Sequence, residues 1–185
     1  MTSAAPQAAG HGSHQPMSPP DEHASPGVEI ERKFLVGELP GDLGRYESDH
    51  IDQGYVAIGD DGVEVRLRRR GDRTLLTVKS GPGPVRVEEE MPIEERRFET
   101  LWPLTEGRRV IKTRYLVPLG SDLVVELDVY AGDLDGLLTA EIEFPSEHAS
   151  AAFEPPGWLG PEITGDERYA NQSLALRGPP PPSES

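Results

Sequence analysis

Residues 62–80 read GVEVRLRRRGDRTLLTVKS, and the alternation within this stretch decides the fold. Charged side chains such as Arg66 and Arg68 alternate with valine and leucine, and the second half of the stretch shows a similar alternation. Side chains two residues apart in a strand lie on the same face, so each half is predicted to be a strand with one apolar and one polar face. The Gly71-Asp72 pair between the halves is typical of a hairpin turn.

The same period of two recurs through most of the chain. It predicts eight strands, at residues 28–36, 51–58, 62–70, 73–80, 84–93, 110–117, 122–131 and 138–144. Helical patterns are fewer and lie at residues 94–104, 146–153 and 166–176. Eight strands with so few helices indicate an α+β fold built on an antiparallel sheet.

Most of the predicted strands carry ionised side chains on one face and apolar side chains on the other. The ionised face holds the cations Lys33, Arg66, Arg68, Lys79, Arg86, Lys112 and Arg114. It also holds the carboxylates Glu29, Glu31, Glu64, Glu88, Glu90, Glu126, Asp128, Glu141 and Glu143. For any single strand, a sheet with one face in water explains this pattern. It fits the whole set of strands less well, because water-facing strand positions usually include many neutral β-branched residues, whereas this face is almost wholly ionised.

Eight strands are about the number at which a sheet closes around one small ligand. We therefore expect an eight-stranded closed antiparallel β-barrel, a tunnel with a charged interior and with the helices packed outside. Buried ions must be paired or hydrated, so the contents of the tunnel should supply counter-charge. Converging arginines and lysines suit phosphate, and clustered carboxylates suit Mg²⁺ or Mn²⁺. This combination predicts a site for a complex of a divalent metal with a polyphosphate.

Composition excludes several classes of function. The chain has 185 residues, no cysteine and a formal net charge of −15. A negative field of this size repels nucleic acids and anionic membranes, so neither is expected as a partner. Without cysteine there can be no disulfide, thiolate metal site or cysteine nucleophile. No apolar run approaches the ~20 residues that span a bilayer, and the N-terminus lacks the features of a secretory signal, so a soluble, cytoplasmic protein is expected.

Composition also divides the chain into a folded part and two tails. Residues 1–27 are rich in alanine, proline and histidine and almost free of aliphatic side chains, so we expect a disordered tail. Residues 178–185 form a second, proline-rich tail. Between them, residues 28–177 are long enough to form one domain with a single core.

The ionised positions also resemble those of a known family. Residues 29–33, EIERK, resemble the Glu-x-Glu-x-Lys signature that opens the CYTH domain, also called the triphosphate tunnel metalloenzyme superfamily. Further residues of this chain resemble the later motifs of that family, in the same order: Arg66-x-Arg68, Lys79, Arg86-x-Glu88-x-Glu90, Lys112-x-Arg114, Glu126-x-Asp128 and Glu141-x-Glu143. Residues 166–175, DERYANQSLA, resemble the family's closing helix. The resemblance covers residues 28–177. QGY at residues 53–55, together with EIERKFLV at residues 29–36, resembles the short bacterial triphosphatases more than the cyclases.

The resemblance implies hydrolysis of inorganic triphosphate, or of a related small-molecule triphosphate, by metal-activated attack of water on a terminal phosphorus. It implies a metal site built from Glu29, Glu31 and Glu143, with Glu88, Glu90, Glu126, Asp128 and Glu141 completing the shell of Mg²⁺ or Mn²⁺ or positioning the water. The phosphates would be held by Lys33, Arg66, Arg68, Lys79, Arg86, Lys112 and Arg114. Catalytic contacts are expected above all from Glu29, Glu31, Lys33, Glu126 and Asp128, and no single general base is assigned.

Other functions stay open at this point. A class IV-type adenylyl cyclase or a thiamine triphosphatase would use a similar tunnel, although no motif indicates an adenine pocket. A non-catalytic module that binds polyphosphate or nucleotide would not need so many carboxylates. The helix predicted at residues 94–104 could fill one mouth of the tunnel, or could pack on the outside of the sheet.

Overall fold

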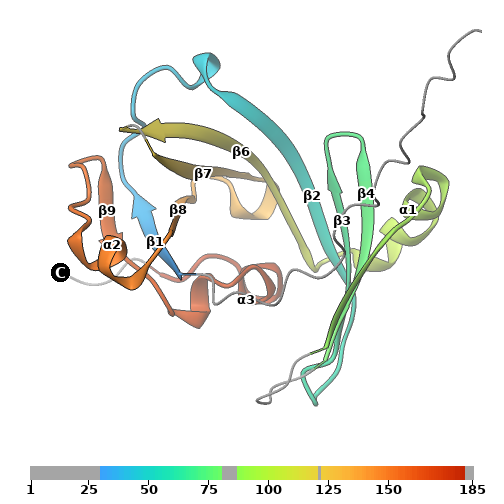
Figure 1. Cartoon of the computed structure of the whole chain (residues 1–185). Helices are drawn as coiled ribbons and strands as arrows, with labels where there is room; N and C mark the ends of the chain where they lie inside the picture. Colours follow the sequence, from blue (N-terminus) through green and yellow to red (C-terminus); the bar gives the residue numbers. More distant parts are fainter. Residues whose placement is uncertain (1–29, 81–86, 121, 182–185) are drawn as a thin grey trace, which may run out of the picture.

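The computed structural model describes residues 30–80, 87–120 and 122–181 (Figure 1). The tail predicted at residues 1–27, the side chains of Glu29 and Arg86, and residues 182–185 of the second predicted tail lie outside these ranges.

The described chain forms one antiparallel sheet of nine strands, in the order β5-β4-β3-β2-β6-β7-β8-β1-β9. The strands are β1 (Ile30–Val36), β2 (Glu47–Ile58), β3 (Glu64–Arg70), β4 (Arg73–Lys79), β5 (Glu88–Pro92), β6 (Arg109–Leu119), β7 (Leu123–Ala131), β8 (Leu138–Phe144) and β9 (Leu159–Glu162). The helices are α1 (Glu95–Leu101), α2 (Glu147–Ala152) and α3 (Asn171–Arg177), with short 3-10 turns η1 (Leu43–Arg45), η2 (Trp102–Thr105), η3 (Gly132–Leu134) and η4 (Glu167–Tyr169). The predicted α+β fold with an antiparallel sheet is confirmed.

The predicted closed eight-stranded barrel is not confirmed, because the sheet curls without closing (Figure 1). In the described part of the chain, no ladder joins the edge strands β5 and β9. Strand β9, which has no alternating pattern in the sequence, pairs with β1 at Phe34 and Val36 and occupies the edge that a closed barrel would need. Pro92 and Pro161 also lack the N–H group that a further ladder would use. Closure depends on the tilt and stagger of the strands, which strand number does not determine.

The main apolar core lies on the outer, convex face of the sheet. Its buried members are Phe34, Val36, Val117, Val125, Leu127, Ala140, Ile142, Phe144 and Leu159. Helix α2 covers this face, where the ring of Phe153 packs against that of Phe144 with centroids 5.2 Å apart. The guanidinium of Arg32 donates hydrogen bonds to the carbonyls of Ser150 and Phe153, which fixes the end of α2 on β1.

Helix α1 and turn η2 also pack on the outer face. Phe98 is fully buried and stacks on Trp102, with ring centroids 5.1 Å apart. Gly54 of β2 permits this packing, because a Cβ atom there would lie 2.6 Å from the side chain of Thr105. Of the two alternatives for residues 94–104, the structure therefore shows packing outside the sheet.

The prediction that the helices pack outside the sheet is wrong for α3, which lies on the inner side of the curl (Figure 1). Leu174 of α3 is buried in a second core with Tyr55, Val110 and Tyr130, which project inward from β2, β6 and β7. These apolar surfaces at one end of the inner face give the amphipathic helix a place to bury its own apolar side. No helix in the described residues has both the length and the apolar character needed to cross a membrane.

Candidate active site on the concave face

The inner face of the curled sheet, here called the concave face, carries the ionised side chains that alternation predicted. Pairing across the strands sets opposite charges side by side: Lys33 is opposite Glu141, and Arg114 is opposite Asp128. Lys79 and Glu88 are partners across β4 and β5 in the same way. Opposite charges that face each other across antiparallel strands stabilise the pairing. The register therefore converts the separate charge patterns of the strands into one network.

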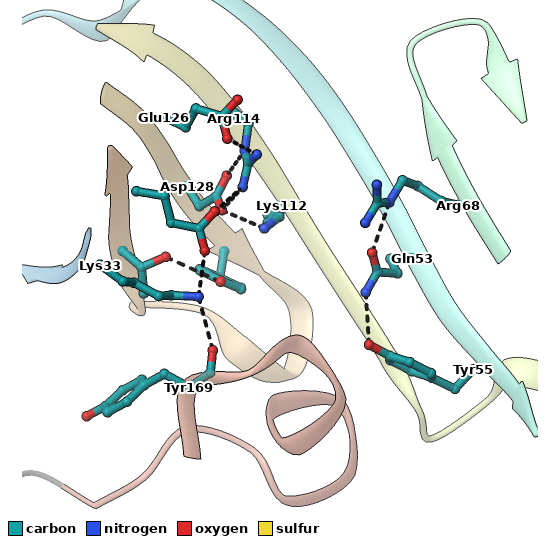
Figure 2. A network of polar contacts seen from close by, with 12 residues as sticks. Lys33, Gln53, Tyr55, Arg68, Lys112, Arg114, Glu126, Asp128 and Tyr169 are labelled. Atoms are coloured by element: carbon teal, nitrogen blue, oxygen red, sulfur yellow. Dashed lines mark hydrogen bonds and ion pairs between the residues drawn. The ribbon is translucent and has the colours of Figure 1, made fainter. Parts of the chain in front are cut away.

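Asp128 is the centre of this network (Figure 2). Its side chain is 0% exposed and accepts a 2.5 Å bond from Nζ of Lys112, which is itself 3% exposed. Arg114 donates to both carboxylate oxygens of Asp128, through Nε and Nη2, at 2.7 Å each. Arg114 also pairs with Glu126. Asp128 thus fixes the orientation of the buried Lys112 and the partly buried Arg114, rather than presenting open carboxylate oxygens as the sequence led us to expect.

Glu141 joins this network to the first strand. Its carboxylate lies 2.8 Å from Nζ of Lys33 and 2.9 Å from Nη2 of Arg114. Burial opposes ionisation of Glu141, but the charges of Lys33, Arg114 and Lys112 outweigh burial and hold its pKa down to about 2. For Arg114, burial is likewise outweighed, and Asp128 and the other carboxylates raise its pKa. Glu141 and Arg114 therefore each stabilise the charged form of the other.

The segment before α3 closes the network at one end. The ammonium of Lys33 donates to the backbone carbonyl of Tyr169 at 3.1 Å, in addition to its ion pair with Glu141 (Figure 2). A cavity of about 220 Å³ opens beside this contact, and it is lined by Glu31, Lys33, Glu141 and residues 163–167, 169 and 170. Lys33 therefore lies between the charge network around Asp128 and this cavity.

The arginines of β3 have different surroundings. Arg68 donates from Nε to the neutral side chain of Gln53 at 3.0 Å, and Gln53 donates in turn to the hydroxyl of Tyr55 (Figure 2). Burial, followed by the charge of Arg66, lowers the pKa of Arg68. Arg66 is 7% exposed, and within the described residues its Nε has no hydrogen-bond partner. This part of the concave face has positive charge and donor capacity to offer an anion.

Two carboxylates on β5, Glu88 and Glu90, approach Arg66 from the solvent-exposed side of the concave face. Glu88 forms a 3.0 Å ion pair with Lys79, and lies 3.9 Å from Nη2 of Arg66. Glu90 lies 4.0 Å from the same nitrogen and accepts a 3.3 Å bond from Thr77. The side chains of Glu88 and Glu90 are about half exposed. They compensate Arg66 weakly, because exposed charges are screened by water.

A cavity of about 140 Å³, here called the inner cavity, lies between the two groups. It is lined by Ile51, Gln53, Arg68, Arg70, Lys112, Arg114, Glu141 and Asn171. Four of these side chains are cations and one is a carboxylate, so the cavity suits an anion. Sequence reasoning missed Gln53, Arg70 and Asn171 as lining residues. The alternation that selected Arg66 and Arg68 would also have selected Arg70, whereas Asn171 was missed because α3 was expected outside.

Two further predicted residues, Glu31 and Glu143, are partners across β1 and β8. Both side chains are exposed. Like charges directly opposite each other destabilise a strand pair, and a bound cation would relieve this repulsion. Among the described residues, no cluster of three or more carboxylate or histidine side chains is arranged to hold a metal ion. Glu29, the third expected ligand, lies outside the described residues, and so does Arg86.

Most of the chain is similar in sequence to two inorganic triphosphatases. An inorganic triphosphatase of Nitrosomonas europaea is 48% identical over 152 residues, which cover 82% of this chain and 99% of that protein. An inorganic triphosphatase of Acetivibrio thermocellus is 37% identical over 153 residues, covering 80% and 93% respectively. A crystal structure of an inorganic triphosphatase superposes with a TM-score of 0.72 at 45% identity and covers 83% of this chain and 98% of that one. No family model matches the sequence. The identity and the coverage of these relatives place the chain in the family of CYTH-type inorganic triphosphatases.

Proposed function

We propose that this chain hydrolyses inorganic triphosphate, or a closely related small-molecule triphosphate, on its concave face with the help of a divalent metal ion. The observation that carries the proposal is the state of the β3 arginines. Arg66 has a buried Nε without a partner in the described chain, and Arg68 donates to a neutral amide. A buried donor that lacks an acceptor is costly, and an anion with several oxygens would satisfy both guanidinium groups.

The ligand should carry several charges, because the cations converge from separate strands. Arg68, Lys112 and Arg114 come from β3 and β6 and line one cavity with a single carboxylate. The whole chain carries a net charge of −15, so it would repel a polyanion everywhere except at such a local concentration of cations. Both triphosphatase relatives, at 48% and 37% identity, agree with a triphosphate as this ligand.

The donor set at Glu31 and Glu143 fits Mg²⁺ or Mn²⁺. These ions prefer oxygen ligands, and Mg²⁺ is commonly bound by one or two carboxylates together with substrate phosphates and water. Glu29, two residues before Glu31 in the sequence, is a further candidate ligand. When bound, the metal ion would neutralise phosphate charge and lower the pKa of a water molecule. We assign Glu88 and Glu90, on the opposite arm of the sheet, to supporting roles beside Lys79 and Arg66.

The chain's own residues would orient the substrate and stabilise charge. Arg66 and Arg68 would bind phosphate oxygens with several donors each, and Lys33 would add a point charge at the end near α3. Lys112 and Arg114 are held in place by Asp128, so we assign that carboxylate to positioning these cations. Prepositioned cations stabilise the charge that develops during in-line attack without having to reorganise.

Phosphate release with Mg²⁺ or Mn²⁺ tests the proposal. The purified full chain should release phosphate from tripolyphosphate faster than from ATP or thiamine triphosphate. Formation of cyclic AMP from ATP would instead assign a cyclase. Tight binding of tripolyphosphate without turnover of any substrate would assign a non-catalytic binding module.

A pair of variants tests the metal ligands. Glu31→Gln removes one ligand charge and should reduce metal-dependent turnover by at least about 100-fold, with an unchanged circular dichroism spectrum. Glu89→Gln makes the same change on β5, on the face opposite Glu88 and Glu90, and should leave turnover at the wild-type level. Equal activities of the two variants would contradict the proposed metal site.

A further inference from the structure

A second cavity lies beside the inner cavity, at the turn between β3 and β4. This outer cavity has a volume of about 400 Å³ and is lined by Asp49, Arg70, Gly71, Asp72 and Arg73. Among the described residues, Arg70 is the one side chain that lines both cavities. A chain of phosphates that extends from the inner into the outer cavity would therefore contact Arg70.

The position of Arg70 continues the row of β3 arginines. It lies two residues beyond Arg68, on the same face of the strand, and is the cross-strand partner of Ile51. Ile51 pairs on its other side with Lys112, so Arg70 belongs to the same transverse row as that lysine. Arg70 donates from Nε to Asp49 at 2.7 Å, and the two side chains are 42% and 37% exposed. A guanidinium has five donor hydrogens, so this ion pair leaves donors available for a phosphate.

The balance of charge changes at Arg70. The inner cavity is lined by four cations and one carboxylate, whereas the outer cavity is lined by two arginines and two aspartates. A phosphate in the inner cavity gains from an excess of positive charge. A phosphate beyond Arg70 meets Asp49 and Asp72, whose charges oppose it and offset those of Arg70 and Arg73. The outer cavity has room for more phosphate but lacks the charge to bind it.

We propose that the ion pair between Arg70 and Asp49 limits the chain length of the substrate. Arg70 binds the last phosphate of a triphosphate, and Asp49 and Asp72 disfavour a fourth phosphate in the outer cavity. The chain thereby selects linear triphosphate over longer linear polyphosphates. This inference rests on the proposed function and adds the basis of its specificity.

The first test removes the charge that opposes longer chains. Initial rates of loss of intact tripolyphosphate and linear tetrapolyphosphate, followed by ion chromatography, give kcat/KM for each. Asp49→Asn should raise the ratio of tetrapolyphosphate to tripolyphosphate about fivefold, the size of one exposed charge interaction. The matched control Asp60→Asn, in the exposed turn between β2 and β3, should keep the wild-type ratio. A ratio in Asp49→Asn equal to that of wild type would overturn the proposal.

The second test concerns the cation itself. Arg70→Gln should raise KM for tripolyphosphate about tenfold with a smaller change in kcat, because a charge-assisted contact to the substrate is lost. Arg70→Lys keeps the charge and should recover part of the loss, which a merely structural role would not predict. A wild-type KM in Arg70→Gln would refute this role. Failure of the wild-type chain to hydrolyse tripolyphosphate would refute the proposed function. If the wild-type chain hydrolyses tripolyphosphate but Asp49→Asn has the same ratio of tetrapolyphosphate to tripolyphosphate hydrolysis, only the present inference is refuted.

Discussion

Replacement of Asp128 by asparagine should cost this protein a large part of its stability. The substitution keeps the volume of the side chain but removes its charge and turns one acceptor oxygen into a donor NH₂ group. In the native site the two oxygens accept three bonds, one from Lys112 at 2.5 Å and two from Arg114 at 2.7 Å. At least one of these bonds must be lost, and an amide N–H then faces a cation.

The magnitude follows from burial. Asp128 is 0% exposed and Lys112 is 3% exposed, so water cannot replace the missing carboxylate. Burial already lowers the pKa of Lys112 despite the opposing charge of Asp128, and removal of that charge should lower it further. Breaking a buried ion pair by removing one partner typically costs about 3–5 kcal/mol. For a domain of this size, that loss should lower the melting temperature by about 10 °C.

Urea unfolding at pH 7, followed by circular dichroism, measures the effect. Glu126→Gln is the matched control, because Glu126 pairs with the same Arg114 but its side chain is 32% exposed. It should lose at most about 1 kcal/mol. The control should unfold within about 1 kcal/mol of wild type. If Asp128→Asn did the same, the reasoning that Asp128 compensates the buried Lys112 and the partly buried Arg114 would be refuted.

Three further predictions concern stability and binding. Although burial opposes ionisation of Glu141, its cationic neighbours lower its pKa from 4.5 to about 2, so its stabilisation is present above about pH 4.5 and is lost as pH falls towards 2. The difference in unfolding free energy between wild type and Glu141→Gln should therefore be about 3 kcal/mol at pH 7, should stay close to that value at pH 5, and should shrink in urea titrations at pH 4 and 3; a constant difference would contradict this. Gly54→Ala should destabilise the chain by about 2 kcal/mol, because its Cβ would lie 2.6 Å from a neighbouring side chain, whereas Gly37→Ala, with open space around it, should change stability little. Arg68→Ala should weaken calorimetric binding of tripolyphosphate at least about tenfold and that of orthophosphate much less, with the exposed Arg96→Ala as control; equal losses for both anions would argue against a clamp for several phosphates.

The pattern of side chains along each strand was predictable, because it depends on local geometry alone. Successive strand residues point to opposite faces whatever the rest of the chain does. Alternation therefore placed Arg66 with Arg68, and Glu126 with Asp128, on a common ionised face. The family that these positions resemble is also the family of the two triphosphatase relatives. The same rule predicted eight of the nine strands, and it failed at β9 because four residues around Pro161 carry no alternation.

The partners of each charge were not predictable, because they depend on register. Nothing in the spacing of Glu126 and Asp128 distinguishes the partly exposed carboxylate of Glu126 from the fully buried one of Asp128. The pairing of β6 with β7 sets Arg114 opposite Asp128, and Lys112 then reaches the same carboxylate. A carboxylate expected at a metal ion is thereby enclosed between two cations.

The sequence by itself determined that this protein has an antiparallel sheet with one ionised face rich in both cations and carboxylates, because period-two alternation is a local property of the strands. Only the tertiary structure decided that the sheet curls without closing, since closure depends on tilt, stagger and the pairing of β9 with β1. Only the tertiary structure, likewise, placed α3 on the concave face and joined the inner and outer cavities at Arg70, because these contacts link segments that lie far apart in the chain.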